Sequence, residues 1–121
     1  MFDSNLKPRR HGAKIQMLVD SVLNSGGDSD PELRRAVEQH VAALAGRLPE
    51  GAVQLPPELA GIIDKIARYA YRVTDEEIDN LKNTGYSEDA IFELMLSAAL
   101  GAGIARLERG MAAMRGGADA A

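Results

Sequence analysis

The chain has no cysteine, no tryptophan and only two histidines among its 121 residues. Without cysteine, this chain cannot form disulfides, thiolate metal sites or iron–sulfur centres, and it cannot perform thiol-based redox chemistry. The histidines, His11 and His40, belong to no cluster with metal-ligand spacing. We therefore expect no metal, no cofactor and no thiol peroxidase activity.

Strong positive charge and long hydrophobic runs are also missing. Fourteen basic residues against eighteen acidic ones give a formal net charge of −4, which argues against a nucleic-acid binder. The basic start, Lys7–Arg10, is followed by no apolar stretch and so does not resemble a signal peptide. The uncharged run 94–105 is shorter than the roughly 20 residues that a membrane span needs. We expect a cytoplasmic protein with neither nucleic-acid nor membrane partners.

What remains is a chain with 45% hydrophobic residues, spaced as in helices. Few β-branched or aromatic runs suggest strands. We predict a flexible basic arm over 1–12, a single all-α domain of five helices over 13–115, and a frayed tail over 116–121. The arm has a second interpretation, in which it docks on an acidic neighbouring subunit.

Apolar residues three and four apart predict the buried face of each helix. In chain order, the expected inward residues are Ile15, Leu18, Val19 and Val22; Leu33, Val37, Val41, Leu44 and Leu48; Leu59, Ile62, Ile63, Ile66 and Ala70; and Ile78 and Leu81.

Polar residues and glycines mark where the helices begin and end. Thr74 and Glu77 have the spacing of a capping box, in which each side chain satisfies a backbone N–H of the other residue. Gly85 is expected to end that helix in a left-handed conformation. The other helix starts are signalled by Asp30 before Pro31 and by Ser87.

The last helix contains the uncharged run Leu94–Ala105. A helix that is apolar all round is expected to be buried on all sides, and four other helices are few to surround it. The sequence therefore predicts a second subunit against this helix. Within the run, Gly101-Ala102-Gly103 looks like half a dinucleotide fingerprint, but Arg106 replaces the third glycine and no strand precedes it. Close helix packing explains these small residues better.

Two other patterns have plain structural explanations. The segment 81–94 has helix-turn-helix spacing, but 75–93 holds seven acids and one lysine, and this surface would repel phosphates. His40 lies on or beside the apolar face of its helix. A hydrogen-bonded core or interface histidine is the better interpretation than a catalytic one.

The segment 67–111, with Gly85-Tyr86-Ser87-Glu88-Asp89-Ala90-Ile91 before an Ala-rich helix, resembles the carboxymuconolactone decarboxylase and alkylhydroperoxidase D-like superfamily. The resemblance implies the all-α fold of that superfamily. It also implies a homo-oligomer, commonly a trimer or hexamer with the Ala-rich helices inside. Redox members carry a CxxC pair followed by a histidine. Here those positions hold Ala70, Val73 and Glu77, so the redox motif is absent.

The same resemblance implies three candidate catalytic residues. Glu58 stands at the position of a proton-relay glutamate, Arg72 lies between the former cysteine positions, and Glu77 replaces the histidine. Together they would line a remnant of the family's pocket, with Tyr69 or Tyr71 nearby, and a small anion could bind there.

Helix geometry limits that hypothesis. Glu58 precedes Arg72 by 14 residues, about 20 Å along a helix, so convergence requires a break, for which Gly61 is a candidate. Each residue also has a structural interpretation: Glu58 as an acid in the first turn of a helix, Arg72 as an ion-pair partner, and Glu77 as the capping-box glutamate.

Two functions remain open at this point. One is a redox-inactive, homo-oligomeric ligand-binding or interaction module. The other is a cofactor-free acid–base enzyme, decarboxylase- or hydrolase-like, acting on a small carboxylated or carbonyl substrate. A small acid bound near Arg72 would favour the enzyme, and a pocket filled by side chains would favour the module.

Overall fold

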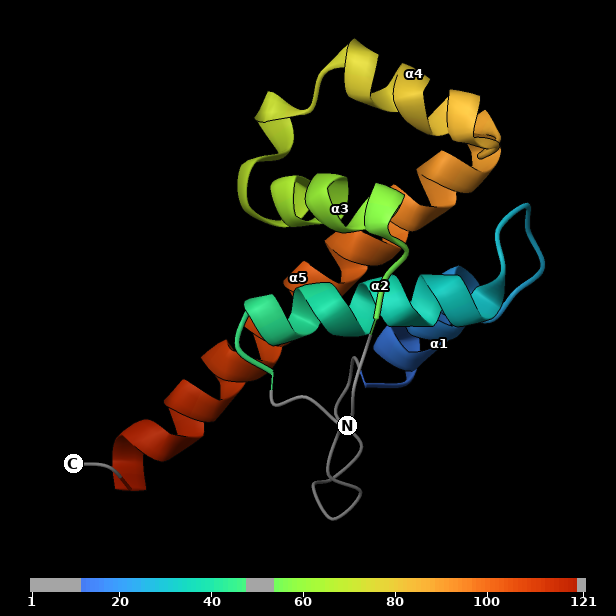
Figure 1. Ribbon diagram of the computed structural model, residues 1–121. Helices are drawn as coiled ribbons and strands as arrows, with labels where there is room; N and C mark the ends of the chain where they lie inside the picture. The colour runs from blue at the N-terminus through green and yellow to red at the C-terminus, as the bar shows by residue number, and fades with distance from the viewer. Residues whose placement is uncertain (1–11, 48–53, 120–121) are drawn as a thin grey trace.

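The computed structural model describes residues 12–47 and 54–119, and over these ranges the chain is helical without strands. The elements are α1 (Gly12–Leu23), α2 (Pro31–Leu44), α3 (Pro57–Tyr69), the short 3-10 helix η1 (Ala70–Arg72), α4 (Asp75–Thr84) and α5 (Glu88–Asp119) (Figure 1). The predicted all-α chain with five α-helices is confirmed for these ranges.

The expected ends of the domain differ from the observed helices. Gly12 begins α1, and the rest of the predicted arm lies outside the described residues. At the other end α5 continues to Asp119, past residue 115 where we expected the domain to stop.

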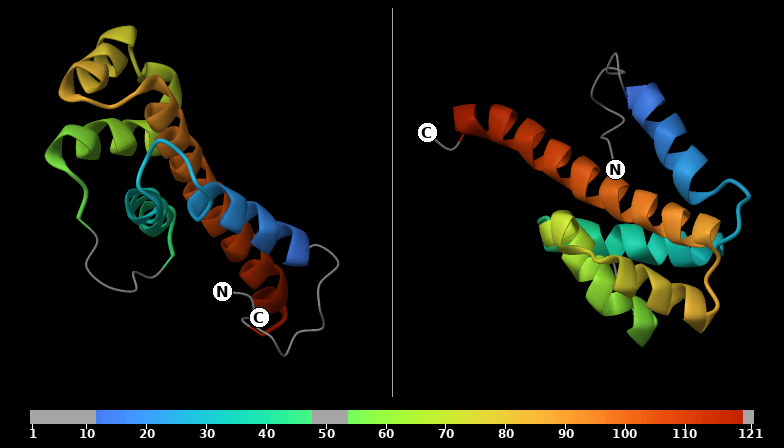
Figure 2. Two further views of the ribbon diagram at one scale, coloured as in Figure 1. Left: turned by 90° about the vertical axis from the view of Figure 1, so that its right-hand side faces the viewer. Right: turned by 90° about the horizontal axis from the view of Figure 1, so that it is seen from above.

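Helix α5 is the axis of the molecule. It runs diagonally through Figure 1, with α2 lying across it, and α3 and α4 lie on the other side of α2 from α1. Seen from above, α1 lies on one side of α5, and α2, α3 and α4 on the other (Figure 2). The C-terminal part of α5 extends beyond the other helices in both views.

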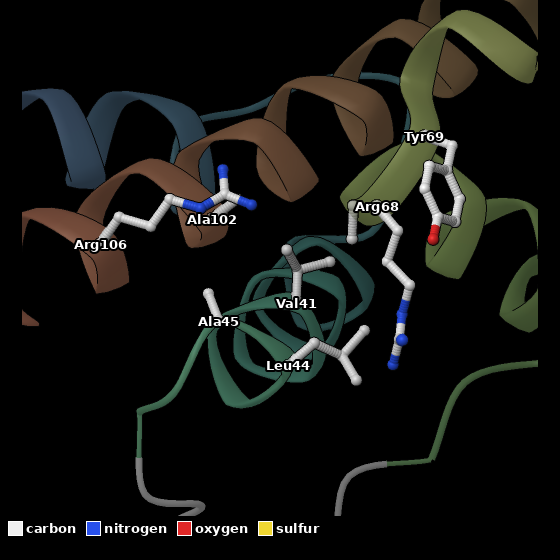
Figure 3. Close-up of a pocket in the computed structure, with 8 residues that line it drawn as sticks. Val41, Leu44, Ala45, Arg68, Tyr69, Ala102 and Arg106 are labelled. Carbon is white, nitrogen blue, oxygen red and sulfur yellow. The ribbon is translucent and has the colours of Figure 1, made fainter.

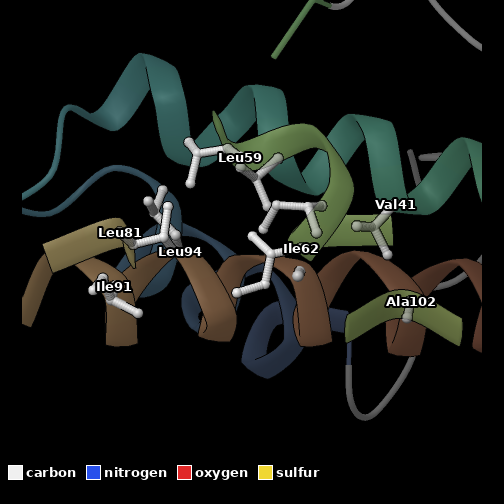
Figure 4. Packing of buried hydrophobic residues seen from close by; sticks show 10 residues of the cluster. Val41, Leu59, Ile62, Leu81, Ile91, Leu94 and Ala102 are labelled. Carbon is white, nitrogen blue, oxygen red and sulfur yellow. The ribbon is translucent and has the colours of Figure 1, made fainter. Parts of the chain in front are cut away.

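The core lies where α2, α3 and α4 meet α5 (Figure 4). Leu59, Ile63 and Leu94 are its largest fully buried hydrophobic side chains. Burial of a side chain of this size stabilises the fold by about 1.5–3 kcal/mol. The core cluster comprises Val37, Val41, Leu59, Ile62, Ile63, Leu81, Ile91, Leu94, Ala98 and Ala102.

Three residues predicted to face inward are exposed. Ala70 is exposed because α3 ends at Tyr69 and the chain tightens into η1, which changes the direction of the next side chains. Leu44 is 41% exposed at the last residue of α2, and Leu18 is 51% exposed because α1 covers only part of the molecule's side. Leu48 lies outside the described residues.

Within this chain, the other helices cover only one face of Leu94–Ala105, as expected if four helices are too few to surround it. The second subunit against the remaining face stays a prediction. One face packs closely on α2, since Ala98 and Ala105 are almost fully buried and a Cβ on Gly101 would collide with the backbone carbonyl of Glu38. The opposite face is open, and no atom lies within 4 Å of a Cβ placed on Gly103. The small residues therefore serve close packing at Gly101 but not at Gly103.

The predicted capping residues are confirmed. The Thr74 hydroxyl accepts from the Glu77 backbone N–H at 3.2 Å, and Glu77 Oε1 accepts from the Thr74 N–H at 2.9 Å. Gly85 ends α4 with φ 118°, a left-handed conformation. Asp30 accepts from the Glu32 N–H at 3.0 Å, with Pro31 next in the chain, and Ser87 Oγ accepts from the Ala90 N–H at 3.0 Å.

Two buried polar contacts hold the loop between α1 and α2. Arg34, 2% exposed, donates to the carbonyl oxygens of Val22 at 2.7 Å and Ser25 at 2.5 Å. Glu93 of α5 accepts from the Ser29 backbone N–H at 2.8 Å and from its hydroxyl at 2.6 Å. The sequence indicated neither contact, because both join residues of ordinary surface type.

Helix α5 is longer than the uncharged run suggested. Residues Glu88–Gly116 are long and apolar enough to cross a membrane by length and composition, with mean hydropathy 1.6. In an 18-residue apolar stretch of this segment, 44% of the residues are buried inside the fold. The core helix of a globular protein can be equally long and apolar, so α5 by itself does not assign a membrane.

Candidate functional site

The structure does not bring Glu58, Arg72 and Glu77 together. Helix α3 runs unbroken from Pro57 to Tyr69, so Gly61 introduces no break. Glu58 and Arg72 therefore lie at opposite ends of α3 and η1, about 20 Å apart by the rise of a helix. No hydrogen bond or ion pair joins any two of the three residues, and each has a different partner, described next.

Glu58 is bound to a tyrosine at the turn between α4 and α5. The Tyr86 hydroxyl donates to Glu58 Oε2 at 2.9 Å. Burial raises the pKa of Tyr86 to about 12, and the hydrogen bond to Glu58 adds to this effect. Tyr86 therefore stays protonated at neutral pH. Glu58 accepts the hydrogen bond from the Tyr86 hydroxyl, and this bond ties the start of α3 to the α4–α5 turn.

Glu77 is a structural carboxylate in this fold. Besides capping α4, it accepts two hydrogen bonds from Lys65 Nζ, at 2.9 and 3.0 Å. The bond from Lys65 and the backbone bond from Thr74 hold the pKa of Glu77 below its ordinary value. An acid that stays ionised and whose oxygens are occupied is poorly suited to donate or accept a proton in catalysis.

Arg72 lies on an aromatic surface rather than in a carboxylate pocket. Its guanidinium carbon is 5.5 Å from the centre of the Tyr69 ring, a cation–π contact. Tyr69 and Tyr71 meet edge to face with ring centroids 6.4 Å apart. Tyr69 and Tyr71 thus lie beside Arg72, but no hydrogen bond or ion pair joins Arg72 to Glu58 or Glu77, with which the tyrosines were expected to share a pocket.

His40 links α2 to α3. Its Nε2 lies 2.7 Å from Asp64 Oδ1, and the two side chains share a hydrogen bond at a half-buried position. This agrees with the interpretation of His40 as a hydrogen-bonded histidine. Within 12–47 and 54–119, no group of three or more His, Cys, Asp or Glu side chains is placed to hold a metal ion.

One pocket lies between the starts of α2 and α5 and the α4–α5 turn, with a volume of about 410 Å³. Its polar groups are already used: Asp30 and Ser87 cap helices, and Ser87 Oγ also donates to Asp28 at 3.2 Å. These bonds serve the fold, so we assign no ligand to this pocket.

A second pocket, of about 300 Å³, lies where α2, the end of α3 and α5 meet (Figure 3). We call it the arginine pocket. Its aliphatic lining comes mainly from α2, and its two cations, Arg68 and Arg106, come from α3 and α5. The lining residues are Val41, Leu44, Ala45, Ala67, Arg68, Tyr69, Ala102 and Arg106.

The sequence reasoning did not identify the arginine pocket. Arg68 has the ordinary position of a basic residue in the last turn of a helix. Arg106 follows Ala102 by one helical turn, and this spacing was the available signal that it lies at the edge of the packed face. The sequence pattern does not indicate that α2 crosses over α5. This crossing brings the two arginines to one pocket.

No protein-family model, no characterised protein and no solved structure matches this chain.

Proposed function

We propose that this chain is a redox-inactive, homo-oligomeric binding module of the carboxymuconolactone decarboxylase-like kind that 67–111 resembles. The observation that carries the proposal is an exposed apolar stripe on α5. This stripe, which we call the outer face of α5, consists of Phe92, Leu96, Ala99, Gly103, Leu107, Gly110 and Met114.

The outer face follows one side of the helix. Its members are three or four residues apart, so they lie opposite the side that packs on α2. The side chains are well exposed: Phe92 63%, Leu96 41%, Leu107 42% and Met114 80%. A continuous apolar strip about 33 Å long, at 1.5 Å per residue, is typical of a protein–protein contact.

The outer face is complementary to itself. About a two-fold axis at Gly103, an antiparallel copy places Leu96 opposite Gly110 and Ala99 opposite Leu107, because each pair lies equally far from Gly103 in sequence. In these two pairs a large side chain meets a small one, two glycines meet at the crossing, and the outermost pair sets Phe92 beside Met114. Apart from the adjoining backbone of α5, no atom of the described residues lies within 4 Å of a Cβ on Gly103 or Gly110, so both positions are open to a partner.

Charge favours the same antiparallel arrangement. The first turn of α5 carries Glu88 and Asp89, and its second half carries Arg106, Arg109 and Arg115 beside Glu108 and Asp119. Antiparallel pairing sets the acidic first turn of one helix toward the second half of the other, where basic residues outnumber acidic ones, whereas parallel pairing sets the two acidic first turns together. A two-fold contact of this kind occurs in a dimer and in a hexamer with dihedral symmetry.

The acid–base enzyme receives no support from the geometry, since no hydrogen bond or ion pair joins Glu58, Arg72 and Glu77 to one another. A cytoplasmic location without nucleic acid or membrane belongs to the proposal as well. Transfer of α5 into a bilayer would separate Leu94 and Ala98 from the core that they share with α2 and α3.

Light scattering coupled to size-exclusion chromatography tests the proposal. The mass of the wild-type particle is expected to be a whole-number multiple, two or more, of the 12.9 kDa of one chain. Leu96→Glu and Leu107→Glu are each expected to give a folded monomer by circular dichroism, because each buries an unpaired charge only in the assembly. Ala112→Glu is the matched control, since Ala112 is exposed on the opposite side of α5. This variant should keep the particle mass of the wild type.

A wild-type particle of 12.9 kDa at micromolar concentration would overturn the proposed assembly. The same result would follow if both glutamate variants kept the wild-type mass. Sedimentation of the wild type with neutral phosphatidylcholine vesicles, lost in Leu107→Glu, would assign the outer face to a membrane instead.

A further inference from the structure

The arginine pocket contains cations that the fold itself does not use. Arg68 and Arg106 make no hydrogen bond or ion pair with any described residue. Other arginines do: Arg47 pairs with Glu38 at 2.8 Å and Glu108 at 3.2 Å, and Arg35 donates to Asn24 at 2.8 Å.

The local charge is opposite to that of the whole chain. The chain has a net charge of −4, yet no acidic residue lines this pocket and two arginines do. Arg72 adds a third cation against the ring of Tyr69, which forms part of the lining. A concave site with one sign of charge attracts ligands of the other sign.

The rest of the lining is apolar and concave. Val41 and Leu44 of α2, with Ala45 just after it, lie between the arginines (Figure 3). Arg106 reaches in from α5 on one side, and Arg68 and Tyr69 come from α3 on the other. A volume of about 300 Å³ lies at the small end of the range for ligand sites.

We propose that the arginine pocket binds a small organic carboxylate that has an apolar body. A guanidinium offers two parallel N–H donors to a carboxylate, and the aliphatic floor receives the apolar part of the ligand. This inference names the ligand class for the proposed binding module, and it depends on that role but not on the assembly through α5.

The test is a titration of the full chain followed by ¹⁵N–¹H NMR. Octanoate and benzoate are the probes; acetate, which lacks the apolar body, and benzamide, which lacks the charge, are the matched controls. Saturable shifts are expected for backbone amides around Val41, Tyr69 and Ala102 with the two probes only. Arg68→Gln and Arg106→Gln are each expected to weaken binding by tenfold or more. Arg35→Gln, which changes an arginine of α2 outside the pocket, should leave binding unchanged.

Three results would overturn the inference. The first is the absence of any saturable shift up to about 10 mM probe, which is tenfold above a millimolar dissociation constant. The second is equal binding of acetate and octanoate, or of inorganic phosphate and benzoate. The third is a probe affinity that stays unchanged in both arginine variants. The titration is repeated on Leu96→Glu. Binding by a monomeric Leu96→Glu separates a failure of the proposed assembly from a failure of the pocket.

Discussion

Gly101 of α5 faces the backbone carbonyl of Glu38 on α2 so closely that a Cβ would collide with that oxygen. The contact sets how near the two longest helices of the core approach each other. Because the neighbour is backbone, it cannot rotate aside as a side chain would. The nearest approach of α2 and α5 therefore depends on one missing methyl group.

Gly101→Ala is expected to destabilise the fold by about 1–3 kcal/mol, the usual cost of forcing an extra group into a packed site. Gly61→Ala is the matched control, since Gly61 is also inside a helix but has no atom within 4 Å of its Cβ position. Alanine there should raise stability by up to about 1 kcal/mol through helix propensity. Urea unfolding of both variants measures the difference, and equal midpoints would contradict the close contact.

The hydrogen bonds of Glu93 predict how the stability of the fold depends on pH. The Ser29 hydroxyl and the backbone N–H groups of Asp28 and Ser29 lower the pKa of Glu93 below its ordinary value of 4.5. A carboxylate with a lowered pKa in the folded state contributes stability above pH 4.5, and this contribution is lost as pH falls through the folded pKa. The melting temperature of the wild type should therefore fall steeply below about pH 4.5.

Glu93→Gln should lower the melting temperature at pH 7 and flatten its fall in acid. Asp79→Asn, which changes an exposed acid of α4, is the control and should follow the wild-type curve. Parallel curves for wild type and Glu93→Gln across pH 3–7 would show that Glu93 is not linked to folding in this way.

Arg34 acts as a buried donor for two carbonyl oxygens at the end of α1 and the loop after it. Arg34→Met keeps most of the side-chain volume but leaves the carbonyls of Val22 and Ser25 without this donor. We expect a loss of about 1–3 kcal/mol. Arg35→Met removes a neighbouring arginine whose partner, Asn24, is exposed, and should cost about 0.5 kcal/mol or less. A smaller loss for Arg34→Met than for Arg35→Met in chemical unfolding would contradict the assignment.

The sequence predicted local features of the fold well, because their causes lie within a few residues. The Thr74–Glu77 box and the left-handed Gly85 depend on neighbours in the chain, and both are where the spacing placed them. Tertiary contacts were predicted less well. Glu93 meets Ser29 across 64 residues, and no local pattern distinguishes it from a solvated acid.

The candidate site shows the same division. The predicted convergence of Glu58, Arg72 and Glu77 required a break in the helix at Gly61. The structure shows α3 as one continuous helix instead. The arginine pocket depends on the crossing of α2 over α5, which joins Arg68 and Arg106 from segments 38 residues apart. Such a crossing is decided by the fit of whole helix faces, and residue spacing along one helix does not reveal it.

Thr74 offers a test of whether the capping box determines the start of α4. Thr74→Ala removes the hydroxyl that accepts the Glu77 N–H, and such a change typically costs about 1 kcal/mol. Thr74→Ser keeps the hydroxyl and should retain most of the stability. Thr84→Ala is the control, because the Thr84 hydroxyl only donates to the Asn80 carbonyl inside the same helix. Amide hydrogen exchange should show faster exchange in the first turn of α4 in Thr74→Ala alone. Unchanged exchange there would mean that the bond from Lys65 to Glu77 holds the helix start without the cap.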